Sequence, residues 1–154
     1  MANPDAVTAS IAADILSKDC LAMRLRVLGR VIAGAYDAAL RPLGLTSGQL
    51  TVLAVLVKLG PMPQARLAEM LMIEKSTLSR NIRRMIEAGL IIEEEVGTPP
   101  RRLISVSRDG RKALAAAYPA WERAQNEALE ALGPEAQAAI KSMADPMLQR
   151  SPLT

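Results

Sequence analysis

The spacing of apolar residues along the chain changes at Gly89. Before it, over residues 75–88, apolar side chains recur every three or four residues, as in a helix with one buried face. After it, segments 90–96 and 103–107 are typical of two strands, and the Gly-Thr-Pro-Pro sequence at 97–100 is typical of the turn between them. Glycine commonly follows the last turn of a helix. The sequence therefore predicts a helix, a glycine stop and a hairpin in succession. The apolar residues of the helix are Leu78, Ile82 and Met85.

Further helices are predicted on both sides of this unit. Their ranges are 12–41, 46–59, 64–72, 108–132 and a last helix that ends near Arg150. Thr46 or Ser47 can cap the second of them, and Ser107 can cap the helix after the hairpin. The first helix should end at the Pro-Leu-Gly break of 42–44, and Gly133 with Pro134 should separate the last two.

The composition favours close-packed helices over a sandwich or barrel. Half of the residues are hydrophobic, yet Phe is absent and aromatic residues make up only 2% of the chain. The core must therefore be built from Leu, Ile, Val, Ala and Met, most of which are good helix formers. The predicted fold class is mainly α with a small β-hairpin wing: a winged helix-turn-helix flanked by N- and C-terminal helices.

Several kinds of site are excluded by composition. A single cysteine cannot form an intrachain disulfide, and the absence of histidine removes imidazole ligands and bases. No phosphate-cradling glycine loop or paired catalytic carboxylate is recognisable, so we expect neither an enzyme nor a cofactor or metal site. The N-terminus lacks a secretory signal, and the longest apolar run, 50–57, is too short to span a bilayer. These features predict a cytoplasmic protein.

The helix before Gly89 has the features of a DNA-reading helix. A helix fits the major groove of B-DNA, and in a helix-turn-helix the second helix is the one that reads bases. The first turn offers hydroxyls and backbone N–H groups to phosphate, and an arginine can form a bidentate contact with guanine. An arginine-rich face seen alone is more often only solvated surface, but the succession of helix, stop and hairpin favours DNA binding. The predicted DNA-binding residues are Gln64, Ser76, Thr77, Ser79, Arg80, Arg83, Arg84, Arg101 and Arg102.

The hairpin carries both signs of charge. Arg101 and Arg102 begin the return strand and are predicted to contact phosphate or the minor groove. Their alternative role is to protect the hairpin edge from aggregation. The acidic triplet 93–95 either faces solvent or pairs with neighbouring arginines, and the sequence does not decide between these arrangements.

In these segments the chain resembles the MarR family of bacterial transcriptional regulators. The resemblance runs from Cys20 to Gln149 and is carried by LGLTSGQ at 43–49, QARLA at 64–68, KSTLSR at 75–80, AGLI at 88–91, the arginines at 101–102 and VSRDGR at 106–111. It implies a homodimer whose first and last helices interlock. It also implies release from DNA by a small, often aromatic, ligand or by cysteine oxidation. Pro100 departs from the family, which usually has an Asp before the two arginines, and this puts the wing contact in doubt.

Candidate effector residues are few. Met23, Arg26 and Tyr36, with the helix around 50–53, could line a ligand pocket, although Met and Leu at helical spacing more often belong to a core. Cys20 is interpreted as a small hydrophobic residue rather than a reactive thiol, since no nearby arrangement clearly lowers its pKa. Tyr118 and Trp121 are assigned to dimer packing in the first instance.

The predicted organisation has four parts. They are a flexible arm at 1–10, an N-terminal dimerisation helix at 11–45, a winged helix-turn-helix domain at 46–107 and C-terminal dimerisation helices at 108–154. We expect a DNA-binding transcriptional regulator, in the first instance a repressor, that binds an inverted repeat as a homodimer. The alternative is a winged-helix protein-interaction module that does not bind DNA specifically.

Overall fold

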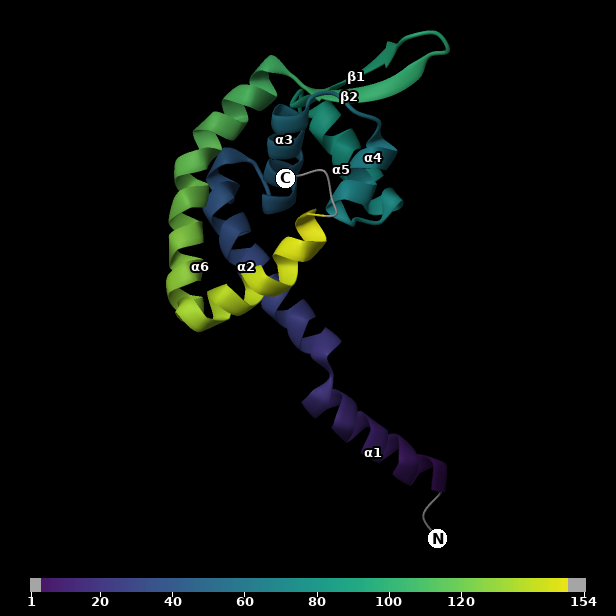
Figure 1. Ribbon diagram of the computed structural model, residues 1–154, viewed down its shortest axis with the longest axis vertical. Coiled ribbons are helices and arrows are strands. Elements are labelled where there is room, and N and C mark those ends of the chain that lie inside the picture. The colour runs from purple at the N-terminus through teal and green to yellow at the C-terminus, as the bar shows by residue number, and fades with distance from the viewer. Residues whose placement is uncertain (1–3, 150–154) are drawn as a thin grey trace. The chain divides into compact units, whose positions relative to one another are not determined.

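The computed structural model describes residues 4–149 of the chain. The chain divides into two units, Met1–Ala35 and Tyr36–Thr154. The described elements are α1 (Pro4–Asp19), α2 (Leu21–Leu40), the short 3-10 helix η1 (Arg41–Leu43), α3 (Ser47–Leu59), α4 (Gln64–Leu71), α5 (Lys75–Glu87), β1 (Ile91–Val96), β2 (Arg101–Val106) and α6 (Arg108–Gln149). The mainly helical fold with one hairpin is confirmed (Figure 1).

The N-terminal region differs from the prediction. The expected flexible arm at 1–10 is helical from Pro4 onward, and the single helix expected over 12–41 is interrupted at Cys20. Proline is favoured in the first turn of a helix, and Asp5 in that turn complements the positive end of the helix dipole. Neither Pro nor Gly marks the interruption at Cys20, so residue spacing could not reveal it. Residues 1–3 of the expected arm lie outside the described residues.

The start of α3 is fixed by three hydrogen bonds, and Thr46, one of the two predicted candidates, is its N-cap. Thr46 and Gln49 form a capping box, in which Gln49 N donates to Thr46 Oγ1 at 3.3 Å and Thr46 N donates to Gln49 Oε1 at 3.0 Å. Asp37, near the end of α2, accepts from Ser47 N at 2.6 Å. The beginning of α3 is therefore held both by its own cap and by the preceding helix.

The core of the second unit consists of aliphatic and methionine side chains, as the lack of aromatic residues requires. Its largest fully buried members are Leu40, Leu53, Leu56, Leu67, Leu78, Met85, Ile91, Ile104 and Val52. They come from α2, α3, α4, α5 and both strands, so one core joins the three short helices to the base of the hairpin.

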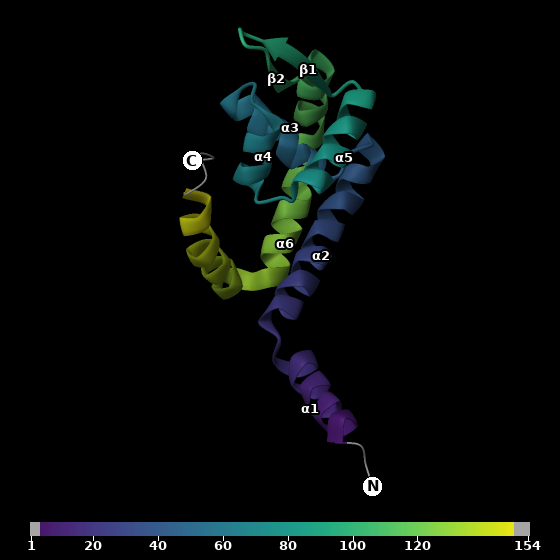
Figure 2. The same ribbon diagram turned by 90° about the vertical axis from the view of Figure 1, so that its right-hand side faces the viewer.

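The hairpin pairs β1 with β2 in antiparallel register, from Ile91 opposite Val106 to Val96 opposite Arg101. Its base is attached to the turn before α4, where Met62 N donates to Ile104 O at 3.1 Å and Ile104 N donates to Met62 O at 2.9 Å. The tip extends beyond α3, α4 and α5 in both views (Figures 1 and 2).

Helix α6 starts directly after β2, at a tightly packed junction. Ser107 caps it, because Gly110 N donates to Ser107 Oγ at 2.9 Å, and the same hydroxyl donates to Gly89 O at 2.6 Å. The predicted break at Gly133 is confirmed, since its backbone has φ 72° and ψ 167°. Arg150, the expected end of the last helix, lies outside the described residues.

No single helix within residues 4–149 is long and apolar enough to cross a membrane. Two consecutive segments reach the length and apolar composition of a membrane span only when they are counted together. They are Leu21–Leu43 and Ser47–Leu59, and the chain bends by 79° between them.

Substitution Gly110→Ala should destabilise the protein by about 1–3 kcal/mol, because an added Cβ would lie 2.1 Å from Leu90 O. Thermal unfolding at a fixed protein concentration would measure the loss. Gly48→Ala is the matched control, since its Cβ would meet nothing within 4 Å. Equal melting temperatures for the two variants would contradict the tight packing at this junction.

Candidate nucleic-acid interface

Helix α5 has one buried face and one exposed face, as its residue spacing predicts. Leu78, Ile82 and Met85 are buried in the core. Thr77, Arg80, Arg83 and Arg84 are exposed. The core contacts therefore hold the helix so that three arginines point away from the domain.

Two recesses flank this exposed face. The α4 recess, about 390 Å³, lies between the starts of α4 and α5 and is lined by Gln64, Ala65, Ala68, Lys75, Ser76 and Ser79. The α3 recess, about 420 Å³, lies between the start of α3 and the middle of α5 and is lined by Thr46, Gly48, Ile73, Thr77, Leu78, Arg80, Asn81 and Arg84. The structure thus brings six of the predicted DNA-binding residues to the two sides of α5. Arg83 is exposed on α5 but lines neither recess.

Glu74 occupies the N-terminus of α5, and the sequence analysis missed it. As the N-cap residue it accepts a hydrogen bond from Thr77 N at 3.1 Å, and Ser76 Oγ also donates to the same carboxylate oxygen. The hydrogen bond from the Ser76 hydroxyl, followed by those from backbone N–H groups, holds the pKa of Glu74 below its usual value. The first turn of α5 therefore already contains an anion.

The two wing arginines point to opposite faces of the hairpin. Side chains alternate along a strand, and the register places Arg102 opposite Glu95 and Arg101 opposite Val96. Arg102 Nε lies 3.5 Å from Glu95 Oε1, and both side chains are largely exposed. Residues 93–95 are all exposed, so the acidic triplet faces solvent and one member also pairs with an arginine.

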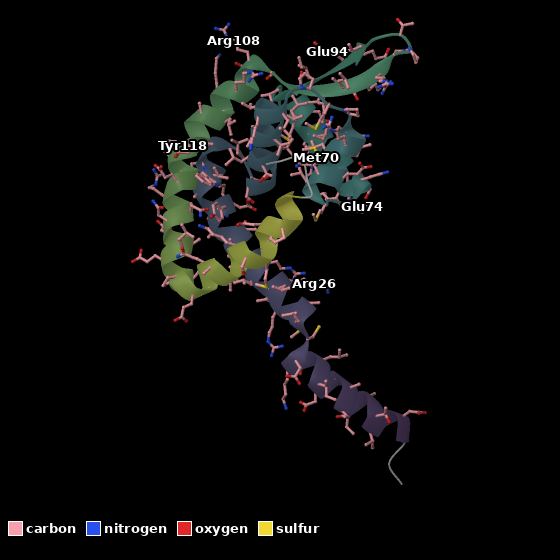
Figure 3. The ribbon with its side chains drawn as sticks, viewed as in Figure 1. Arg26, Met70, Glu74, Glu94, Arg108 and Tyr118 are labelled. Atoms are coloured by element: carbon pink, nitrogen blue, oxygen red, sulfur yellow. The ribbon has the colours of Figure 1, made fainter. Side chains whose placement is uncertain are left out.

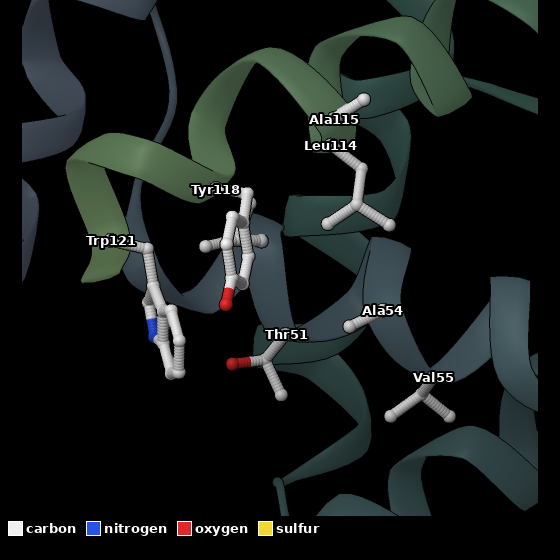
Figure 4. A pocket seen from close by; sticks show the side chains of 8 residues that line it. Thr51, Ala54, Val55, Leu114, Ala115, Tyr118 and Trp121 are labelled. Carbon is white, nitrogen blue, oxygen red and sulfur yellow. The ribbon is translucent and has the colours of Figure 1, made fainter. Parts of the chain in front are cut away.

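A third concave site lies between α3 and α6, away from the exposed arginines of α5. This apolar cavity, about 580 Å³, is lined by Leu50, Thr51, Ala54, Val55, Leu114, Ala115, Tyr118 and Trp121. Figure 4 shows Leu114 and Tyr118 extending from α6 toward Thr51 and Ala54 of α3. The rings of Tyr118 and Trp121 are 5.8 Å apart at their centroids. Among the described residues that line the cavity, none is charged.

The predicted effector residues are not those that line the apolar cavity. Met23 and Arg26 are exposed on α2 within the first unit. The expectation for the helix around 50–53 does coincide with the cavity lining, through Leu50 and Thr51. Tyr36 is half-buried, donates its hydroxyl to Gln125 Oε1, and has its pKa raised by burial. Cys20 is half-buried at the junction of α1 and α2.

Comparison with known proteins agrees with this architecture. The family model described as the MarR family matches residues 43–102. An uncharacterised HTH-type transcriptional regulator of Bacillus subtilis, YwoH, is 31% identical over 83 residues, which are 54% of this chain and 61% of that protein. The match therefore spans less than two thirds of that curated relative.

Solved structures match over most of the chain. The Mycobacterium tuberculosis transcriptional regulator MosR is 30% identical, with a TM-score of 0.72, and the match covers 84% of this chain and 96% of MosR. MosR has also been crystallised with DNA. BpsR of Bordetella bronchiseptica, whose DNA binding is regulated by 6-hydroxynicotinic acid, shares the fold at 19% identity and a TM-score of 0.72, covering 84% of this chain and 93% of BpsR.

Proposed function

Because this chain belongs to the MarR family of DNA-binding transcriptional regulators, we propose that it represses transcription by binding an inverted-repeat operator as a homodimer. The observation that carries the proposal is the exposed face of α5, where Arg80 and Arg84 border one recess and Ser76 and Ser79 border the other. A helix presented in this way fits the major groove, and its arginines can donate to guanine O6 and N7. Such a protein would act in the cytoplasm, where bacterial DNA is found.

The homodimer proposal is supported by apolar surface on the first unit. Helices α1 and α2 expose large hydrophobic residues along most of their length, which is unusual for a helix that remains in water. These residues are Val7, Ile11, Ile15, Leu16, Leu21, Met23, Leu25, Val27, Leu28 and Val31. This surface supports the assignment of residues 11–45 to dimerisation. We further propose that residues 108–154 take part in dimerisation and that residues 46–107 bind DNA. A twofold dimer would place its two α5 helices on half-sites about one turn of DNA apart.

The apolar cavity between α3 and α6 is the proposed effector site. Its lining offers aromatic and aliphatic surface, with the hydroxyl of Thr51 as one polar group at its edge. An uncharged ligand with an aromatic ring suits such a lining, because a charged group would lose its hydration without gaining an opposite charge. Regulation of BpsR by 6-hydroxynicotinic acid supports the aromatic ring in this choice, although that molecule also carries a carboxyl group.

The DNA-binding proposal predicts that the double substitution Arg80→Ala with Arg84→Ala abolishes specific binding. Each bidentate contact with guanine is worth about 1–3 kcal/mol of discrimination, so the double variant should lose at least about thirtyfold in affinity. Binding of the full chain to its own upstream intergenic DNA and to a scrambled duplex, across a salt series, would measure this.

Arg123→Ala is the matched control for that experiment, because Arg123 is exposed on α6, away from both recesses. Unchanged specific binding by the double variant would contradict the role of these two arginines. Absence of binding by the unmodified chain to either duplex at low salt would favour the alternative function, a winged-helix module that contacts proteins. Equal affinity of the unmodified chain for both duplexes would leave only nonspecific attraction to phosphate.

The effector proposal predicts that Ala54→Leu separates ligand response from DNA binding. Ala54 is exposed on the cavity side of α3, so a larger side chain should fill the cavity without disturbing α5. Neutral aromatic compounds that quench Trp121, the only tryptophan, should also release DNA from the unmodified chain. The variant should bind DNA with unchanged affinity but require at least about tenfold more ligand for release. Equal ligand response in both proteins would contradict this location.

Oxidation of Cys20 is the alternative trigger. We expect Cys20→Ser to leave DNA affinity and ligand response unchanged, because the thiol is interpreted as a small packing residue at the α1–α2 junction. DNA binding with and without hydrogen peroxide would test this. Release by peroxide from the unmodified chain, and not from the variant, would establish the redox trigger instead.

A further inference from the structure

We propose that Tyr36 and Gln125 are positioning residues of the effector site, and that the hydrogen bond between them holds the aromatic wall of the apolar cavity in place for a ligand. This inference rests on the proposed function, in which that cavity binds the effector. Neither side chain is among those that line the cavity. Their role is therefore to preorganise the site without touching the ligand.

The aromatic wall of the cavity and Gln125 share one face of α6. Tyr118 and Trp121 line the cavity. Gln125 follows Trp121 by about one helical turn and so continues the same face. The Tyr36 hydroxyl donates to Gln125 Oε1, and burial raises the pKa of Tyr36, so that the hydroxyl keeps the hydrogen that it donates. The end of α2 is thereby tied to α6 directly beyond the cavity.

The next residue of α2 holds the opposite wall. Asp37 Oδ1 accepts from Ser47 N at 2.6 Å, at the start of α3. Thr51, which lines the cavity, donates its hydroxyl to Ser47 O at 3.0 Å. Two consecutive residues of α2 therefore bind the two helices that face each other across the cavity, and they set the distance between those helices at this end.

The junction with the hairpin supports α6 at the other end of the cavity. Ser107 caps α6 at its first turn, beside Arg108. Figure 3 shows Tyr118 well along α6 from Arg108, and residues 108–118 span about three turns. The cavity lining is apolar, and apolar contact has no preferred direction. A hydrogen bond does have one, so the bond from Tyr36 restricts the position of the aromatic wall at the far end.

A tie that only stabilises the packing of α2 on α6 is the competing explanation, and the chain offers variants that separate the two. Tyr36→Phe keeps the ring and removes the donor. Gln125→Met keeps the length of the side chain and removes the acceptor. Asn126→Met is the matched control, because Asn126 is the exposed neighbour of Gln125 on α6.

The test uses the fluorescence of Trp121, the only tryptophan, in the full-length protein. Nitrobenzene, an uncharged aromatic quencher, is titrated into each protein, and melting temperatures are measured in parallel. We expect saturable quenching of the unmodified chain. Tyr36→Phe and Gln125→Met should each weaken nitrobenzene binding by about two- to tenfold, the factor that corresponds to one net hydrogen bond. The double variant should bind no more weakly than either single variant, because both changes remove the same bond.

Accessibility of Trp121 is the second readout. Quenching by acrylamide, which reports the exposure of the indole to solvent, should increase in Tyr36→Phe and Gln125→Met because the aromatic wall is no longer held. Asn126→Met should change neither nitrobenzene affinity nor acrylamide quenching.

Unchanged nitrobenzene affinity and unchanged acrylamide quenching in both single variants would overturn the inference, whatever their melting temperatures, and would leave the proposed effector site intact. Absence of saturable quenching in the unmodified chain would contradict the proposed effector site and the inference with it. If Tyr36→Phe does not fold, Gln125→Met decides, because it removes the same bond from the other helix.

Discussion

The junction around Ser107 connects every part of the molecule that the proposed mechanism uses. Its hydroxyl accepts from Gly110 N in α6 and donates to Gly89 O at the end of α5, and Ser107 N donates to Leu90 O at 3.0 Å. Gly110 packs so closely on Leu90 that a side chain has no room. The end of α5, the base of the hairpin and the start of α6 are therefore joined by hydrogen bonds and close packing. The proposed effector cavity between α3 and α6 lies only a few turns of α6 from this junction.

Local sequence signals were sufficient for most of this architecture. The intervals between Leu78, Ile82 and Met85 predicted which face of α5 is buried. Ser107 was predicted as a cap, and Thr46 was one of two candidates for the cap of α3. These features depend on residues within a few positions of each other, where helix geometry and hydrogen-bonding chemistry leave few alternatives. The order of helix, glycine and hairpin was predictable for the same reason.

The features that the sequence did not reveal depend either on weak local preferences or on contacts between distant segments. Glutamate is not among the favoured N-cap residues, so residue preferences alone did not indicate that Glu74 caps α5. The apolar cavity joins Thr51 to Tyr118 and Trp121, which are far apart in the chain. Spacing on one helix cannot show which other helix faces it. Dimer packing was therefore the simplest interpretation of Tyr118 and Trp121, and the structure shows in addition that both line the cavity beside α3.

The charge arrangement on the hairpin assigns different roles to its two arginines. Arg102 shares a face of the hairpin with Glu93 and Glu95 and lies 3.5 Å from Glu95. The negative charge of Glu95 therefore offsets part of the positive charge of Arg102. Arg101 lies on the other face, opposite an apolar residue, with Glu94 only diagonally across. An exposed ion pair at 3.5 Å is weak and easily replaced by a phosphate, whereas an arginine without a directly opposed carboxylate needs no such exchange. If the hairpin contacts DNA as proposed, Arg101 would be available at once, whereas Arg102 would first have to leave its acidic partner.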